Sequence, residues 1–225
     1  MLALPMLVFA MVAHEYAHAV TALRQGDDTA YRLGRVTLNP LPHIDPLMSI
    51  LLPALLWFGS GGSFTFGGAK PVPVNTARYR NFKKGDILVS GAGVVTNLIL
   101  ALVWAVMFVV VGLVGRSFPA TAPVLDTVQR MMVYGIWLNL ILCFFNLIPV
   151  PPLDGSHLFY HLLPPRAGLW YHGLQRFGYL PIFVLMFVFR PAMVVLLAPA
   201  YKGMVLLLQL IYPFRVGHGW NIFQS

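Results

Sequence analysis

The chain has 225 residues, of which 58% are hydrophobic and only 10% are charged. Soluble domains carry roughly 25% charged residues, so this composition excludes an ordinary soluble globule. It predicts an all-α polytopic membrane protein with five to six transmembrane or re-entrant helices, because about 20 apolar residues span a bilayer. We expect a single membrane-embedded domain over residues 1–225, since no long polar linker divides the chain.

The formal net charge is +8, and the basic residues lie in the connections between apolar runs. Because no aromatic-basic surface accompanies them, this distribution argues against nucleic acid as a partner. The densest basic group is Arg78, Arg80, Lys83 and Lys84. The positive-inside rule predicts that this group faces the cytoplasm, and we expect a prokaryotic cell (inner) membrane protein. The single cysteine, Cys143, allows no disulfide framework and no cysteine metal cluster.

The apolar runs set the order of the predicted helices. They cover residues 2–23, 47–58, 86–114, 131–148, 169–189 and 193–212. The second run is short for a full crossing, so it is predicted to be re-entrant or half-inserted. The last two runs are predicted to be C-terminal transmembrane helices, together over about residues 169–212.

Residues 63–74 predict a small β-hairpin between the first and third hydrophobic segments. Small or polar residues alternate with aromatic ones in its first arm, Gly67-Gly68 makes a turn, and its second arm contains prolines. Prolines confine that arm to the edge of a sheet. Such an edge could pair with an extended peptide, or the hairpin could serve only to link two helices.

The first apolar run contains the sequence His14-Glu15-Tyr16-Ala17-His18. On a helix, residues at i and i+4 share one face, so both imidazoles can hold one metal ion. The glutamate beside them can take a proton from the attacking water, as in HExxH metalloproteases. Ionisable side chains in an apolar helix are costly unless they face the protein interior. The alternative is a structural polar cluster that bonds to neighbouring helices.

A catalytic zinc takes three protein ligands, so a third ligand must come from elsewhere in the chain. Asp154 is the best candidate, because it follows the proline-rich break after the run 131–148, on the same predicted side of the membrane as the histidines. The alternative is an ordinary turn aspartate. Asp86 and Asp126 lie at predicted helix beginnings, where capping explains a carboxylate.

His157 and His161 form a second pair at i and i+4. Leu158 stands where HExxH has its glutamate, so this pair lacks a base. We therefore expect these two histidines to be interfacial rather than to bind the metal.

Three motifs in this order resemble the site-2 protease family of intramembrane zinc metalloproteases (peptidase family M50), in its compact form without a PDZ domain. They are the HExxH sequence, GAGVVTNL at residues 91–98 and NLIPVPPLDG at residues 146–155. The resemblance implies a catalytic core over about residues 1–160. It also implies an endopeptidase that cleaves peptide bonds in or near transmembrane segments of membrane-protein substrates, in regulated intramembrane proteolysis.

Residue by residue, the resemblance implies one zinc ion per chain, held by His14, His18 and Asp154, with Glu15 as the base. Asn146 would steady the oxyanion or the substrate backbone. Asn97 is a weaker candidate for a similar role, and its alternative is a hydrogen bond between helices. The site would be reached from the cytoplasmic side.

The expected partners are transmembrane protein or peptide substrates and the lipid bilayer, and the sequence predicts no oligomeric state. Two non-proteolytic functions remain open. One is an ion or proton transporter that uses the cluster of His14, Glu15 and His18. The other is a pseudoprotease that binds membrane helices without cutting them.

Overall fold

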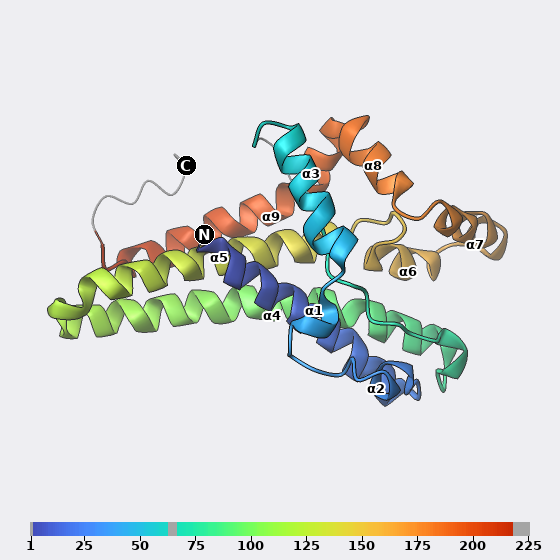
Figure 1. Ribbon diagram of the computed structural model, residues 1–225, viewed down its shortest axis with the longest axis horizontal. Helices are drawn as coiled ribbons and strands as arrows, with labels where there is room; N and C mark the ends of the chain where they lie inside the picture. Colours follow the sequence, from blue (N-terminus) through green and yellow to red (C-terminus); the bar gives the residue numbers. More distant parts are fainter. Residues whose placement is uncertain (1, 63–66, 218–225) are drawn as a thin grey trace. The chain divides into compact units, whose positions relative to one another are not determined.

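A computed structural model describes residues 2–62 and 67–217 of the chain (Figure 1). Among these residues, four helical segments are long and apolar enough to cross a membrane, and no strand is formed. The spanning segments contain α1 (Ala3–Gln25), α4 (Phe82–Ser117), α5 (Ala122–Asn146) and α9 (Arg190–Ile211). The shorter helices are α2 (Thr29–Arg32), α3 (Leu52–Gly59), α6 (Asp154–Tyr160), α7 (Pro165–His172) and α8 (Leu180–Phe187). The chain is an all-α, integral membrane protein, as its composition predicted.

The chain divides into two compact units. The described residues of Met1–Ala10, Asn97–Phe145 and Leu185–Ser225 form one, which we call the bundle unit. Those of Met11–Thr96 and Asn146–Val184 form the other, which we call the site unit. The candidate metal ligands all belong to the site unit.

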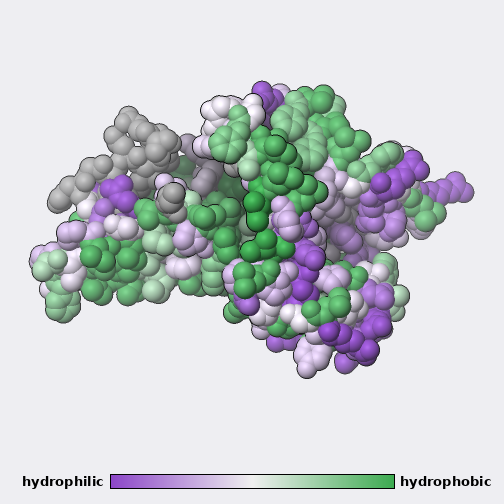
Figure 2. Space-filling model, in the orientation of Figure 1, coloured by the Kyte–Doolittle hydropathy of each residue, from purple (hydrophilic) through white to green (hydrophobic). Residues whose placement is uncertain are grey.

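The bundle unit is held together by apolar side chains of three helices, α4, α5 and α9. Its buried core consists of Ala101, Ala105, Phe108, Met132, Ile136, Leu140, Ala200, Met204, Leu208 and Ile211. Large apolar side chains on the same helices are exposed, among them Val106, Val110, Leu113 and Leu206. Figure 2 shows hydrophobic residues over the visible surface of these helices, as expected of a surface that faces lipid.

The site unit begins with the second half of α1, which ends in a glycine cap. Gly26 has a φ of 110°, and a Cβ there would lie 3.0 Å from the Arg78 carbonyl oxygen. The amide of Gly26 donates to the Leu23 carbonyl, and that of Asp27 donates to Ala22. This pair of bonds closes a helix end with a left-handed residue, for which glycine is favoured.

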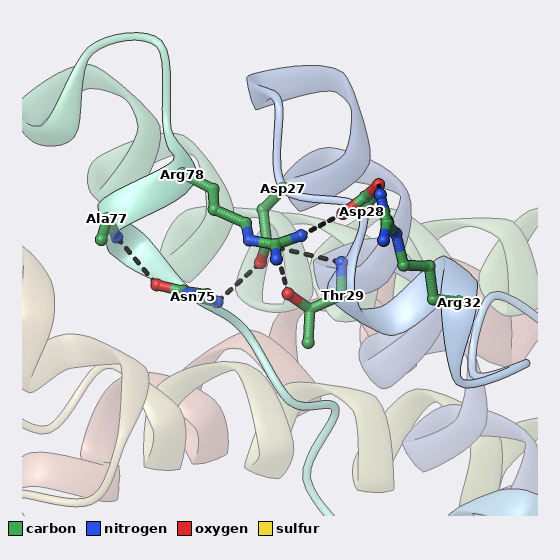
Figure 3. A network of polar contacts seen from close by, with 7 residues as sticks. All are labelled: Asp27, Asp28, Thr29, Arg32, Asn75, Ala77 and Arg78. Carbon is green, nitrogen blue, oxygen red and sulfur yellow. Dashed lines mark hydrogen bonds and ion pairs between the residues drawn. The ribbon is translucent and has the colours of Figure 1, made fainter.

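A buried carboxylate joins the end of α1 to the segment before α4 (Figure 3). Asp27 is fully buried and accepts hydrogen bonds from the amide and hydroxyl of Thr29 and, at 2.6 Å, from the amide of Asn75. The neighbouring Asp28 forms an ion pair with Arg78. These bonds fix the segment around residue 75 against the C-terminal end of α1.

The predicted β-hairpin is not seen. Its first arm, residues 63–66, lies outside the described residues, and residues 67–75 form an extended segment without a strand. We call this segment the strap. Backbone groups of the strap bond to side chains and loops of the site unit, and these bonds replace the ladder of a hairpin.

The predicted C-terminal helix over residues 169–189 is also broken. It is divided between α7, a 3₁₀ turn at Gly173–Phe177, and α8. Gly178 takes a φ of 55°, and Pro181 follows at the start of α8. A left-handed glycine and a proline that lacks an amide donor both interrupt helical hydrogen bonding. The apolar helical segment Pro46–Gly59 is shorter than a span, as predicted for the run 47–58.

Candidate metal centre

The two histidines of the HExxH sequence lie one above the other on the inner face of α1. His14 is 7% exposed and His18 is 9% exposed, in a helix that is otherwise apolar. Their Nε2 atoms are 2.9 Å apart. The i, i+4 spacing therefore brings two metal-donor atoms to one point inside the site unit.

Asp154 brings the third donor atom to the same point. It is the first residue of α6, after the proline-rich segment that follows α5. Its Oδ2 atom lies 3.2 Å from His14 Nε2 and 3.3 Å from His18 Nε2. Among the described residues, these three side chains form the group whose donor atoms converge within 4.8 Å. The structure thus brings Asp154 to two histidines that precede it by about 140 positions in the sequence.

A hydrogen bond made by Nδ1 of His18 orients the ring so that its other nitrogen, Nε2, faces the centre. His18 Nδ1 lies 2.7 Å from the carbonyl oxygen of Val89 on α4. A carbonyl can only accept, so Nδ1 carries a proton, and Nε2 is the atom whose lone pair can be offered to a metal when the ring is neutral. Metal-binding histidines are commonly oriented in this way by the other ring nitrogen.

The three donors fit a zinc ion. Ligand atoms about 2.0–2.2 Å from a tetrahedral zinc lie roughly 3.3–3.6 Å from one another, close to the distances of 2.9–3.3 Å seen here. The Asp154 Oδ2 atom is buried and receives no well-directed hydrogen bond from a described residue. Burial alone would raise the pKa of Asp154, but the two imidazoles outweigh it and hold that pKa below its ordinary value. The carboxylate is therefore an ionised acceptor that a cation would satisfy.

A glycine of α4 forms one wall of this centre. A Cβ at Gly93 would lie 2.5 Å from His18 Nε2 and 2.6 Å from His14 Nε2. A carbon atom that close would overlap both rings. The absence of a side chain at Gly93 therefore lets α4 approach the donor atoms.

The glutamate of the HExxH sequence contacts the strap. One carboxylate oxygen of Glu15 accepts a hydrogen bond of 2.7 Å from the amide of Val72. The strap is held nearby by Arg35, which donates to the Lys70 carbonyl at 2.8 Å, and by the Lys70 amide, which donates to the His43 carbonyl at 2.8 Å. The sequence left His43 without a role, and in the structure its carbonyl helps to hold the strap in place.

The two asparagines predicted from the family resemblance lie in different units. Asn146 is half-buried at the end of α5 and belongs to the site unit. Asn97 is fully buried in the bundle unit, where its amide donates to Asn139 at 2.9 Å and to the Ala10 carbonyl at 3.4 Å. These bonds are the interhelical contacts that were the alternative for Asn97. A catalytic role for either asparagine stays a prediction.

A second polar cluster was not foreseen as a unit. The buried Asp86 carboxylate lies 3.1 Å from His157 Nδ1 and 2.8 Å from His161 Nε2. The sequence suggested helix capping for Asp86 and an interfacial position for the histidines. Their i, i+4 spacing at the end of α6 was the signal for a shared partner, but one carboxylate, 71 residues before His157 and 75 before His161, could not be chosen from the sequence.

Comparisons with known proteins found a matching family model and several similar proteins. The family model described as peptidase family M50 matches residues 114–187. The chain is 38% identical to "Putative zinc metalloprotease YwhC" of Bacillus subtilis over 185 residues. This aligned region covers 81% of this chain and 78% of that protein. It is 30% identical over 181 residues to "Putative zinc metalloprotease Rip2" of Mycolicibacterium smegmatis, of which it spans 64%. No solved structure gave a significant match.

Proposed function

Because the chain belongs to peptidase family M50, the site-2 type of zinc metalloprotease, we propose that it hydrolyses peptide bonds in or near transmembrane segments of other membrane proteins. Such cleavage would release membrane-tethered domains, which is regulated intramembrane proteolysis. The observation that carries this proposal is a buried triangle of two imidazoles and a carboxylate in the site unit of an integral membrane protein. A metalloprotease centre in that setting has membrane-embedded chains as its nearest substrates.

One zinc ion per chain would be held by His14, His18 and Asp154. When bound, zinc polarises the scissile carbonyl and brings the pKa of water to about 7. The protein would supply the fixed geometry of the three donor atoms, a His18 ring that its Nδ1 hydrogen bond orients so that Nε2 faces the centre, and a largely buried carboxylate that neutralises part of the charge. Burial matters because electrostatic interactions are stronger where water is excluded.

Glu15 is proposed as the general base. Its carboxylate would accept the proton of the attacking water and later deliver it to the leaving amine. The Val72 amide holds one carboxylate oxygen at 2.7 Å, so the side chain has a defined orientation before substrate arrives. Asn146, half-buried in the same unit, is proposed to donate a hydrogen bond to the oxyanion or to the substrate backbone.

We propose that water and substrate reach the metal centre from the cytoplasm, because basic residues cluster near the beginning of α4. Arg78 and Arg80 lie just before α4 and Lys83 and Lys84 lie in its first turn, all upstream of Val89, whose carbonyl orients His18. Positive residues flank transmembrane helices on the cytoplasmic side of a bacterial inner membrane. Water and the soluble product would then enter and leave on that side.

The substrate helix must open before it can be cut, because its own hydrogen bonds hold the scissile carbonyl. A single-span peptide with Gly-Pro near its centre is expected to be cleaved at least tenfold faster than its Leu-Leu counterpart, since proline costs a helix about 3 kcal/mol. The measurement is product formation by mass spectrometry in proteoliposomes. Both peptides need equal insertion, checked by oriented circular dichroism.

The same assay separates a protease from the alternatives. Chelation should stop cleavage of both peptides, and added zinc should restore it. Absence of any zinc-dependent product from either peptide would contradict the proposed function. Equal rates for the two peptides would contradict only the requirement for local unwinding.

A further inference from the structure

A buried polar cluster of the site unit, outside the metal centre, joins α4 to α6 and to its C-cap residue, His161. Asp86 is 4% exposed, and its two carboxylate oxygens each contact one imidazole, His157 at 3.1 Å and His161 at 2.8 Å. The His161 side chain is 6% exposed. A buried carboxylate between two imidazoles holds their helix firmly, because charge-assisted hydrogen bonds are stronger than neutral ones.

The helix so held is the one that begins with Asp154. Residues three and four apart share a face of a helix, so Asp154, His157 and the C-cap residue His161 follow one another along the same side of α6 and its C-terminal end. The hydrogen bond that His157 donates to Asp86 is the main factor that raises the pKa of His157, so its ring stays an imidazolium through more of the neutral pH range. Asp86 therefore restrains both the position and the rotation of α6.

One turn of α4 serves both sides of the centre. Asp86 contacts α6, and Val89, three residues later on the same face, accepts the hydrogen bond from His18 of α1. The two helices that carry the candidate ligands, α1 and α6, are thus both bonded to the same short stretch of α4.

We propose that Asp86 is a positioning residue, which through α6 fixes where the Asp154 carboxylate stands against the two zinc-binding imidazoles. It acts through His157 and His161 and touches neither substrate nor metal. The inference rests on the proposed zinc site. Residues that orient metal ligands typically contribute 10- to 100-fold to metal affinity.

The test is zinc affinity of the purified full-length protein, titrated against a chelator in detergent. Asp86→Asn keeps the side-chain volume and removes the charge and one acceptor, so it is expected to weaken zinc binding about 10- to 100-fold. With cobalt in place of zinc, its visible absorption bands should shift, because the geometry of one ligand changes. Asp126→Asn is the matched control, since Asp126 forms a surface ion pair with Arg130, and it should bind zinc as the wild type does.

A pair of substitutions at His161 distinguishes positioning from a structural role. In His161→Gln, the amide nitrogen can replace Nε2 as donor to Asp86, and zinc affinity should stay within about threefold of the wild type. In His161→Leu the donor is lost, and affinity should fall about tenfold or more. Should Asp86→Asn fail to fold, this pair decides the question alone.

Two outcomes separate the inference from the function on which it rests. Wild-type zinc affinity and an unchanged cobalt spectrum in Asp86→Asn and His161→Leu, with zinc lost in Asp154→Ala, would overturn the positioning role and leave the zinc site standing. No zinc in the wild type, or unchanged zinc in Asp154→Ala, would overturn the proposed centre itself.

Discussion

Replacement of Gly93 by alanine is expected to remove most of the zinc and with it the proteolytic activity. The new methyl group would lie 2.5 Å from His18 Nε2 and 2.6 Å from His14 Nε2, nearly equidistant from two donor atoms. Either the rings turn away or α4 moves back, and both changes break the donor triangle. Overpacking of this kind costs about 1–3 kcal/mol, which corresponds to a loss of roughly 5- to 150-fold in affinity.

Gly91→Ala is the matched control for this substitution. It lies two residues earlier on the same helix, and a Cβ there has no atom within 4 Å. Both variants gain the same helix propensity, so a difference between them reports the contact with the imidazoles. Zinc content by plasma emission spectrometry and peptide cleavage are the measurements. Full zinc occupancy in Gly93→Ala would show that α4 does not form a wall of the centre.

Glu15→Gln is expected to abolish cleavage and to leave zinc in place. Glutamine cannot accept the proton of the attacking water, and loss of a general base typically lowers the rate about 10²- to 10⁴-fold. The carboxamide oxygen can still accept the hydrogen bond from Val72, so the strap should stay attached to α1. Zinc content and thermal stability in detergent should therefore match the wild type.

The same variant tests the two non-proteolytic alternatives. A transporter would keep a metal-independent flux across proteoliposomes, and a binding protein would capture membrane helices as the wild type does. Cleavage within tenfold of the wild-type rate, with zinc bound, would exclude Glu15 as the base and require another proton acceptor.

The convergence of His14, His18 and Asp154 was the tertiary feature that the sequence predicted best. The i, i+4 spacing of His14 and His18 has a single geometric meaning on a helix, and polar residues in an apolar run must face inward. Asp154 was harder, because an aspartate after prolines is also an ordinary turn residue. The structure brings its carboxylate to the two imidazoles, and the role of the three residues as zinc ligands stays a prediction.

Other features that depend on tertiary contacts were predicted less well. Residues 63–74 read as a hairpin because they alternate, but the described part of the strap bonds to Glu15, Asp27 and Arg35 instead of to a second strand. Hydropathy marked residues 169–189 as one span, although Gly178 permits a left-handed backbone that ends the helix. Asp86 could not be paired with its histidines, since the partners are more than 70 residues apart.

The measurement that tests the central claim most directly is the zinc content of the detergent-purified protein beside that of Asp154→Ala. The donor triangle predicts one zinc per wild-type chain and strong loss of zinc in the variant, which would keep two imidazoles and no third ligand. Equal zinc in the two proteins, with both folded, would show that α1 and α6 do not share an ion and would contradict the assignment of this centre.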